Sequence, residues 1–212
     1  MITRREFVAG TSALAVLATF DMTVGSAWAQ AATPTDLLVP PALGDRVLGK
    51  DDAPVTIVEY ASMTCPHCAA FHEKAYPELK KRYIDTGKVR FIFREFPLDT
   101  LAAAAAMLAR CADKDKYFPL IETLFQHQRE WAVQNPIPPL MGIAKQAGFT
   151  EEKFNACLSD QKMLDAIEAE RNRASKQFGV NSTPTIFVNG QMQRGIATID
   201  DLAKLIDPLI KS

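Results

Sequence analysis

The chain has 212 residues, and its 24 Lys and Arg nearly balance its 25 Asp and Glu, which gives a formal net charge of −1. This balance argues against nucleic acid as a partner, and the length suffices for one domain or for one domain with an insertion. The sequence contains no internal repeat and no low-complexity tract.

The N-terminus has the pattern of an export signal. Residues 3–8 resemble a twin-arginine start, an apolar stretch follows, and residues 26–29 (Ser-Ala-Trp-Ala) form an A-x-A cleavage pattern. The apolar stretch is interrupted by Asp21 and is too short to span a membrane. We therefore expect a signal peptide over residues 1–29 that is cleaved near Ala29, and a soluble mature protein in the periplasm. The pattern leaves open whether export uses the general secretion route or the twin-arginine route.

The next hundred residues predict two strands around one helix. Residues 30–46 contain three prolines and are expected to be a loosely ordered lead-in. Residues 55–60 (Val-Thr-Ile-Val-Glu-Tyr) have the composition of a buried strand. Apolar residues at helical spacing follow over 69–83, and the alternation in 88–93 predicts a second strand.

The remaining chain is first helical and then mixed. Residues 101–178 predict four or five helices and no strand, so we interpret them as a helical insertion. A hairpin follows with its turn at Asn189-Gly190, and a capped helix that Pro208 should kink or shorten ends the chain. The expected fold class is α/β, with one domain built from residues 47–100 and 179–212 and interrupted by this insertion.

Two cysteines separated by two residues stand where the first predicted strand gives way to a helix, in the sequence Cys65-Pro66-His67-Cys68. A thiol at a helix N-terminus meets unpaired backbone N–H groups and the positive end of the helix dipole, which both favour the thiolate. Pro66 lacks an N–H and fits the first turn. We interpret the pair as a redox switch in which Cys65 attacks and Cys68 resolves. A zinc half-site and an inert buried pair are the alternatives, and no second Cys or His pair completes a zinc site.

The energy required indicates what must surround Cys65. Lowering the pKa of a thiol from ~8.5 to ~5 requires roughly 5 kcal/mol, whereas a helix dipole contributes about 0.3 to 2 kcal/mol. Direct hydrogen bonds must supply the rest. The backbone N–H groups of Cys68 and His67 are the expected donors.

The other two cysteines, Cys111 and Cys157, both fall inside the predicted insertion. If the first pair is bonded within itself, a structural Cys111–Cys157 bridge is the natural remainder, although four cysteines permit three connectivities. Such a bridge fits an oxidising compartment. The alternative is two separate buried thiols, because free cysteine packs like a small hydrophobic residue.

Glu59 stands six residues before Cys65 within an otherwise apolar strand. A carboxylate buried there could exchange a proton when Cys68 leaves or attacks. The alternation of Val58 and Tyr60 around it equally fits an edge-strand glutamate that points to water. His72 and His127 lack a second ligand set, and we expect each to be a helix-surface histidine or a satisfied core histidine.

Together these features resemble the DsbA-like thiol-disulfide oxidoreductases of the thioredoxin superfamily. The resemblance covers residues 46–211 and is carried by the Cys65-to-Cys68 motif, by Glu59, by the Thr183-Pro184 dipeptide before a strand, and by the helical block between them. It implies a thioredoxin-like fold with a helical insertion.

The resemblance also assigns roles to single residues. Pro184 matches the family's cis-proline, whose loop faces the two cysteines and lets backbone groups of Thr183 pair with a substrate strand. His67 matches the position that stabilises the reduced thiolate, so we expect it to influence the redox potential more than Thr183 does. Thr183 departs from the valine common in the best-known oxidases and leaves the direction of electron flow open.

The expected function is disulfide donation to reduced or unfolded exported proteins by a monomer that needs no cofactor and no metal. Reoxidation would come from a membrane partner resembling the DsbB quinone reductase. One alternative is an isomerase or reductase of the same fold, although the lead-in is too short for the dimerisation domain of dimeric isomerases. Further alternatives are a copper-binding periplasmic protein using Cys65, His67 and Cys68, which lacks a surrounding methionine cluster, and a non-catalytic peptide-binding module.

Overall fold

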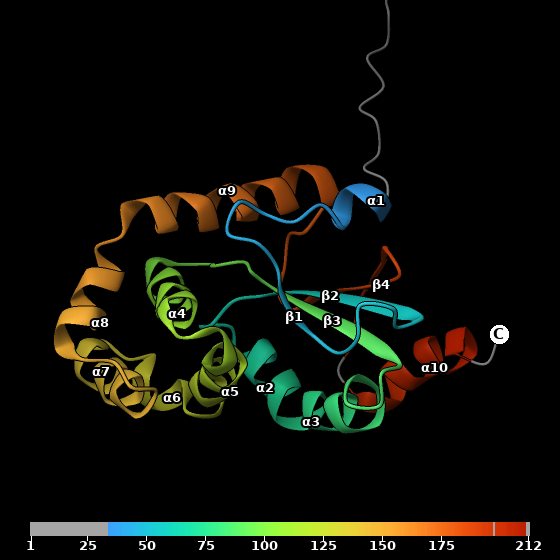
Figure 1. Cartoon of the computed structure of the whole chain (residues 1–212), viewed down its shortest axis with the longest axis horizontal. Coiled ribbons are helices and arrows are strands. Elements are labelled where there is room, and N and C mark those ends of the chain that lie inside the picture. Colours follow the sequence, from blue (N-terminus) through green and yellow to red (C-terminus); the bar gives the residue numbers. More distant parts are fainter. Residues whose placement is uncertain (1–33, 197, 211–212) are drawn as a thin grey trace, which may run out of the picture. The chain divides into compact units, whose positions relative to one another are not determined.

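The computed structural model describes residues 34–196 and 198–210 (Figure 1). The predicted signal peptide and its cleavage site lie outside these residues. In the described part of the chain, no helix combines the length and the apolar character needed to cross a membrane.

A five-stranded mixed sheet forms the centre of the fold, with the strand order β1-β3-β2-β4-β5. β2 runs parallel to β3 and antiparallel to β4, so it is paired on both edges. β2 and β3 are rich in β-branched and aromatic residues and are buried along almost their whole length, as central strands should be. The strands are β1 (Arg46–Leu48), β2 (Val55–Ala61), β3 (Val89–Glu95), β4 (Thr185–Val188) and β5 (Gln191–Gln193).

The described part of the lead-in is ordered, so the expectation of a loose segment is wrong from residue 34 onward. It contains the short helix α1 (Pro34–Leu37) and continues into β1. Two buried arginines hold it in place: Arg94 binds the carboxylate of Asp45, and Arg110 binds the backbone carbonyl of Gly44. These partners lie more than 45 residues away in sequence, which local patterning cannot reveal.

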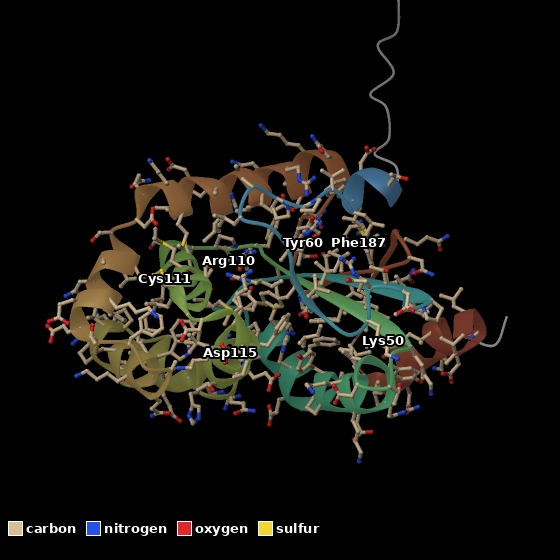
Figure 2. All side chains as sticks on the ribbon, viewed as in Figure 1. Lys50, Tyr60, Arg110, Cys111, Asp115 and Phe187 are labelled. Atoms are coloured by element: carbon tan, nitrogen blue, oxygen red, sulfur yellow. A yellow bond between two sulfur atoms is a disulfide. The ribbon has the colours of Figure 1, made fainter. Side chains whose placement is uncertain are left out.

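Helices cover both faces of the sheet (Figure 1). On one face lie α2 (Pro66–Lys74), α3 (Tyr76–Leu79), the π-helical turn η1 (Lys80–Ile84) and α10 (Ile199–Ile210). The single helix predicted over 69–83 is therefore interrupted. Its break follows from Pro77, which cannot donate an N–H to the preceding turn. The opposite face packs against α9 (Gln161–Phe178), and Ala174 shares a buried cluster with Tyr60 and Phe187 of the sheet (Figure 2).

Residues 101–178, all of which the structure describes, contain helices and no strand, as predicted. They form six α-helices rather than four or five, with one short 3-10 turn between the first two. These elements are α4 (Thr100–Cys111), η2 (Lys114–Lys116), α5 (Tyr117–Gln126), α6 (Gln128–Trp131), α7 (Ile137–Gln146), α8 (Glu151–Leu158) and α9. A disulfide joins Cys111 at the end of α4 to Cys157 in α8, with 6.1 Å between their Cα atoms (Figure 2).

Candidate active site

Cys65 is the N-cap residue of α2, and its sulfur lies at the point where unpaired backbone N–H groups gather. Its backbone is extended (φ −76°, ψ 120°), and Pro66 occupies the first position of the helix, as the sequence predicts. Cys65 is 6% exposed and Cys68, one turn inside the helix, is 0% exposed. The two are free thiols in this structure.

The surroundings of Cys65 favour its charged form. The pKa of Cys65 is lowered from 9.0 to about 5, and the largest cause is a hydrogen bond with the Cys68 thiol. The Thr183 hydroxyl and the backbone N–H groups of Cys68 and His67 also lower this pKa, whereas burial raises it. The two backbone donors expected from the sequence are therefore present. The strongest single donor is instead the second cysteine, which a helix-terminus argument leaves out.

The surroundings of Cys68 act in the opposite direction. Burial, the hydrogen bond to Cys65 and the negative charges of Glu59 and Cys65 raise the pKa of Cys68 well above its ordinary value, although a backbone hydrogen bond with Ser62 opposes this. At neutral pH these opposite shifts favour the thiolate at Cys65 and the thiol at Cys68. Because only a thiolate is a good nucleophile, the pair is chemically unequal before any substrate arrives.

The loop before β4 closes over Cys65. The Thr183–Pro184 peptide bond is cis, as the family resemblance implies. The Cys65 thiol donates to the carbonyl oxygen of Thr183 at 3.2 Å. The Thr183 hydroxyl oxygen is buried and has no hydrogen-bond partner in this state. When Cys65 ionises, its sulfur becomes an acceptor, and the free hydroxyl is available to donate to it.

His67 stands apart from this arrangement. Its side chain is exposed, and its contribution to the low pKa of Cys65 comes from the backbone N–H. An alanine at this position would keep that donor. The ranking of His67 above Thr183 expected from the resemblance therefore has little support in the geometry.

Glu59 is buried rather than exposed, so the edge-strand interpretation is wrong. β2 is paired on both sides, and Glu59 is 0% exposed. Its two carboxylate oxygens lie 3.0 and 3.2 Å from Nε2 of His72. His72 is also buried and partnered, but its Nδ1 has no hydrogen-bond partner, so it is not the fully satisfied core histidine expected. His127 is the surface histidine expected, and its Nδ1 lies 2.9 Å from Glu130.

Gln128 is a residue that sequence reasoning missed. It begins α6 in the insertion, and its buried side-chain amide donates to the backbone carbonyls of Met63 at 2.8 Å and Cys65 at 3.0 Å. The insertion thereby holds the loop that carries Cys65. No local motif marks such a glutamine, because its partners lie over 60 residues earlier.

A groove of about 460 Å³ lies between His67 of the active-site helix and the cis-proline loop. Its walls combine the active-site helix, the cis-proline loop and the segment after β5. They are formed by His67, Ala70, Phe71, Lys74, Thr183, Pro184, Ile186, Gln193, Gly195, Ile196 and Thr198. Among the described residues, no group of three or more His, Cys, Asp or Glu side chains is placed to hold a metal ion.

Comparison with known proteins agrees with this geometry. Residues 42–208 match the family described as Thioredoxin. A Rickettsia bellii relative named as a protein-disulfide oxidoreductase is 37% identical over 169 residues, which cover 79% of this chain and 65% of the relative. The chain thus spans slightly less than two thirds of that relative. Disulfide bond formation protein D of Bacillus subtilis is 30% identical over 178 residues, with 81% of this chain and 80% of the relative covered.

Solved structures give the same result at the level of the fold. The crystal structure of alpha-DsbA1 from Wolbachia pipientis superposes with a TM-score of 0.78 and 33% identity, covering 84% of this chain and 96% of that one. BdbD from Bacillus subtilis superposes with a TM-score of 0.72 and 29% identity, covering 82% and 97%. The expected fold class, a thioredoxin-like sheet interrupted by helices, is confirmed. The chain belongs to the DsbA-like thiol-disulfide oxidoreductases of the thioredoxin superfamily.

Proposed function

We propose that this protein is an exported disulfide oxidase that donates a Cys65–Cys68 disulfide to reduced, unfolded proteins in the periplasm. The observation that carries this proposal is the position of Cys65 at the N-cap of α2, where hydrogen bonds lower its pKa to about 5. A stabilised Cys65 thiolate favours the reduced enzyme, so reduction of the Cys65–Cys68 disulfide releases free energy. The disulfide is therefore a strong oxidant.

The reaction uses the inequality of the two sulfurs. A substrate thiolate attacks Sγ of Cys65, a substrate–Cys65 disulfide forms, and the Cys65–Cys68 bond breaks. Cys68 leaves and takes up a proton, for which its raised pKa prepares it. We assign this proton transfer to the buried Glu59, which supplies the proton in this direction and takes it back when the Cys65–Cys68 disulfide forms again. A second substrate thiolate then attacks the substrate sulfur, a substrate disulfide forms, and Cys65 leaves as a stable thiolate.

The groove between His67 and the cis-proline loop is the proposed binding site for the substrate chain. Phe71, Ile186 and Ile196 give it apolar contacts, and the cis-proline loop brings the backbone of Thr183 to its edge. Apolar walls and backbone pairing recognise an extended chain with little dependence on its sequence. That selectivity suits an enzyme that acts on many unfolded proteins.

The remaining parts of the proposal rest on the sequence. Residues 1–29 would direct export, and a membrane protein resembling the DsbB quinone reductase would reoxidise the cysteine pair. The protein would act as a monomer.

An isomerase is the second candidate. Thr183 favours it, because the family resemblance puts valine at this position in the best-known oxidases and threonine in isomerases. Oxidised protein mixed with reduced, unfolded ribonuclease A separates the two. We expect the ribonuclease to lose thiols, with one disulfide delivered per molecule of protein. Failure to oxidise the ribonuclease, combined with reactivation of scrambled ribonuclease by the reduced protein, would favour the isomerase instead.

A further inference from the structure

The Glu59 side chain is held by one buried histidine. Both carboxylate oxygens lie within hydrogen-bond distance of Nε2 of His72, and Glu59 and His72 are 0% and 5% exposed. Among the described residues, no arginine or lysine forms an ion pair with Glu59. By contrast, the buried Glu95 is bound by the guanidinium of Arg110 through two hydrogen bonds. Glu59 thus lacks the guanidinium partner that Glu95 has, and its partner is an imidazole, whose ring nitrogens can donate or accept a hydrogen bond.

Aromatic rings fix the imidazole of His72 in place. Phe125 stacks on it with 4.4 Å between ring centroids, and Tyr76 lies over it at 4.6 Å. Phe71 and Phe93 approach it at steep angles. The ring therefore has little freedom to turn away from Glu59.

We propose that His72 is a positioning residue that holds Glu59 as the ionised acceptor for the Cys68 proton by donating its Nε2–H to the carboxylate. The inference rests on the proposed proton transfer between Glu59 and Cys68 and adds His72 to it. Only an ionised carboxylate can take up a proton from Cys68, and a hydrogen bond donated to a carboxylate favours its charged form.

The step in question is the closure of the enzyme disulfide, which oxidised glutathione can drive. The Cys65 thiolate attacks glutathione disulfide, so a Cys65–glutathione bond forms and one glutathione thiolate leaves. Cys68 then attacks Sγ of Cys65, the Cys65–Cys68 bond forms, and the second glutathione thiolate leaves. The proton of Cys68 passes to Glu59 in this second step.

Several other titratable groups face this pair. Cys68 lies on the same helix as His72, and Glu59 comes from β2. Tyr76 of α3 covers one face of the imidazole. Burial is the largest cause of the raised pKa of Tyr76, and the negative charge of Glu122 in α5 raises it further. Phe93 of β3 contributes no titratable group. A pH-dependent signal must therefore be assigned with variants.

The test measures the rate of the second step between pH 5.5 and 8.5 by acid quenching and mass spectrometry of the glutathionylated protein. His72→Phe keeps a ring in the cage and removes the donor, His72→Gln keeps an N–H donor, and His127→Gln is the surface control. We expect His72→Phe to slow disulfide closure about tenfold near pH 6, with the rate recovering toward pH 8. A tenfold change in this rate corresponds to a displacement of the pH profile by about one unit. His72→Gln should retain most of the wild-type profile, and His127→Gln should match it.

Glu59→Gln separates the two proposals. If it changes the profile and His72→Phe does not, the inference about His72 is wrong while the role of Glu59 stands. If neither variant changes the profile, both are wrong. If His72→Phe does not fold, nitrogen NMR of the wild-type imidazole decides the question. A protonated Nε2 at pH 7 is expected, and an unprotonated Nε2 would make Glu59 the donor and overturn the inference.

Discussion

The two cysteine pairs have different surroundings, although Cys65, Cys68 and Cys157 are all buried. Cys65 and Cys68 lie at a helix N-terminus. Hydrogen bonds there lower the pKa of Cys65, whereas burial, a hydrogen bond and nearby negative charge raise that of Cys68. Cys111 and Cys157 join two helices of the insertion and are bonded to each other. Proximity alone therefore does not make a cysteine pair reactive. Hydrogen-bond donors around one sulfur and burial of the other make the two sulfurs of the first pair unequal.

The largest expected effect concerns the inequality within the first pair. In the reduced protein at pH 6, Cys65 should react rapidly with iodoacetamide because it is largely ionised, and Cys68 should react at least a hundredfold more slowly. Cys65→Ser should abolish disulfide transfer to a peptide dithiol. Peptide mapping of the labelled protein measures the difference, and rapid labelling of Cys68 would reverse the assignment of attacking and resolving sulfurs.

The second pair should affect stability without affecting reactivity. Cys111 and Cys157 are separated by 46 residues, and a loop of that length contributes about 4 kcal/mol in the chain-entropy treatment. The Cys111→Ala/Cys157→Ala double variant should lose up to that free energy of unfolding in urea. Its rate of Cys65 alkylation as a function of pH should match that of the wild type. A clear change in that rate would show that the two pairs are coupled.

The pH dependence of stability sharpens the same contrast. The pKa of Cys65 in the folded, reduced protein is lowered to about 5 from 9.0. A lowered pKa contributes stability that is fully present above the unfolded value and is lost as the pH falls through the folded one. The reduced protein should therefore gain a few kcal/mol over Cys65→Ser between pH 5 and pH 9, since one pKa unit corresponds to about 1.36 kcal/mol. Urea titrations at several pH values measure this difference, and a constant difference would be inconsistent with an ionised Cys65.

The smallest expected effect separates Thr183 from His67. Thr183→Val removes a hydroxyl that helps to lower the pKa of Cys65, so it should raise that pKa by about one unit or less. His67→Ala keeps the backbone donor and should have a smaller effect. This order is the reverse of the one expected from the family resemblance. Alkylation rates against pH compare the two variants, and a larger shift for His67→Ala would restore the original order.

The sequence predicts the features that depend on local patterning. The strand before Cys65, the helix that begins at Pro66, the helical block and the final hairpin all follow from periodicity, capping and turn residues. The features it misses depend on partners distant in the chain. Gln128 reaches the Cys65 loop from the insertion, and buried arginines order the lead-in.

Glu59 and His72 show the same limit within the active site. The alternation around Glu59 fits a buried and an exposed carboxylate equally well, and only the pairing of β2 on both edges decides between them. His72 carries no sequence signal at all, because its importance comes from the carboxylate and the aromatic rings around it.

The equilibrium redox potential of the Cys65–Cys68 pair against glutathione tests the central claim most directly. The low pKa of Cys65 predicts a potential well above that of thioredoxin, which is about −270 mV, because a stabilised thiolate favours the reduced enzyme. A potential at or below about −270 mV would contradict the oxidase proposal and would indicate that the protein works as a reductase.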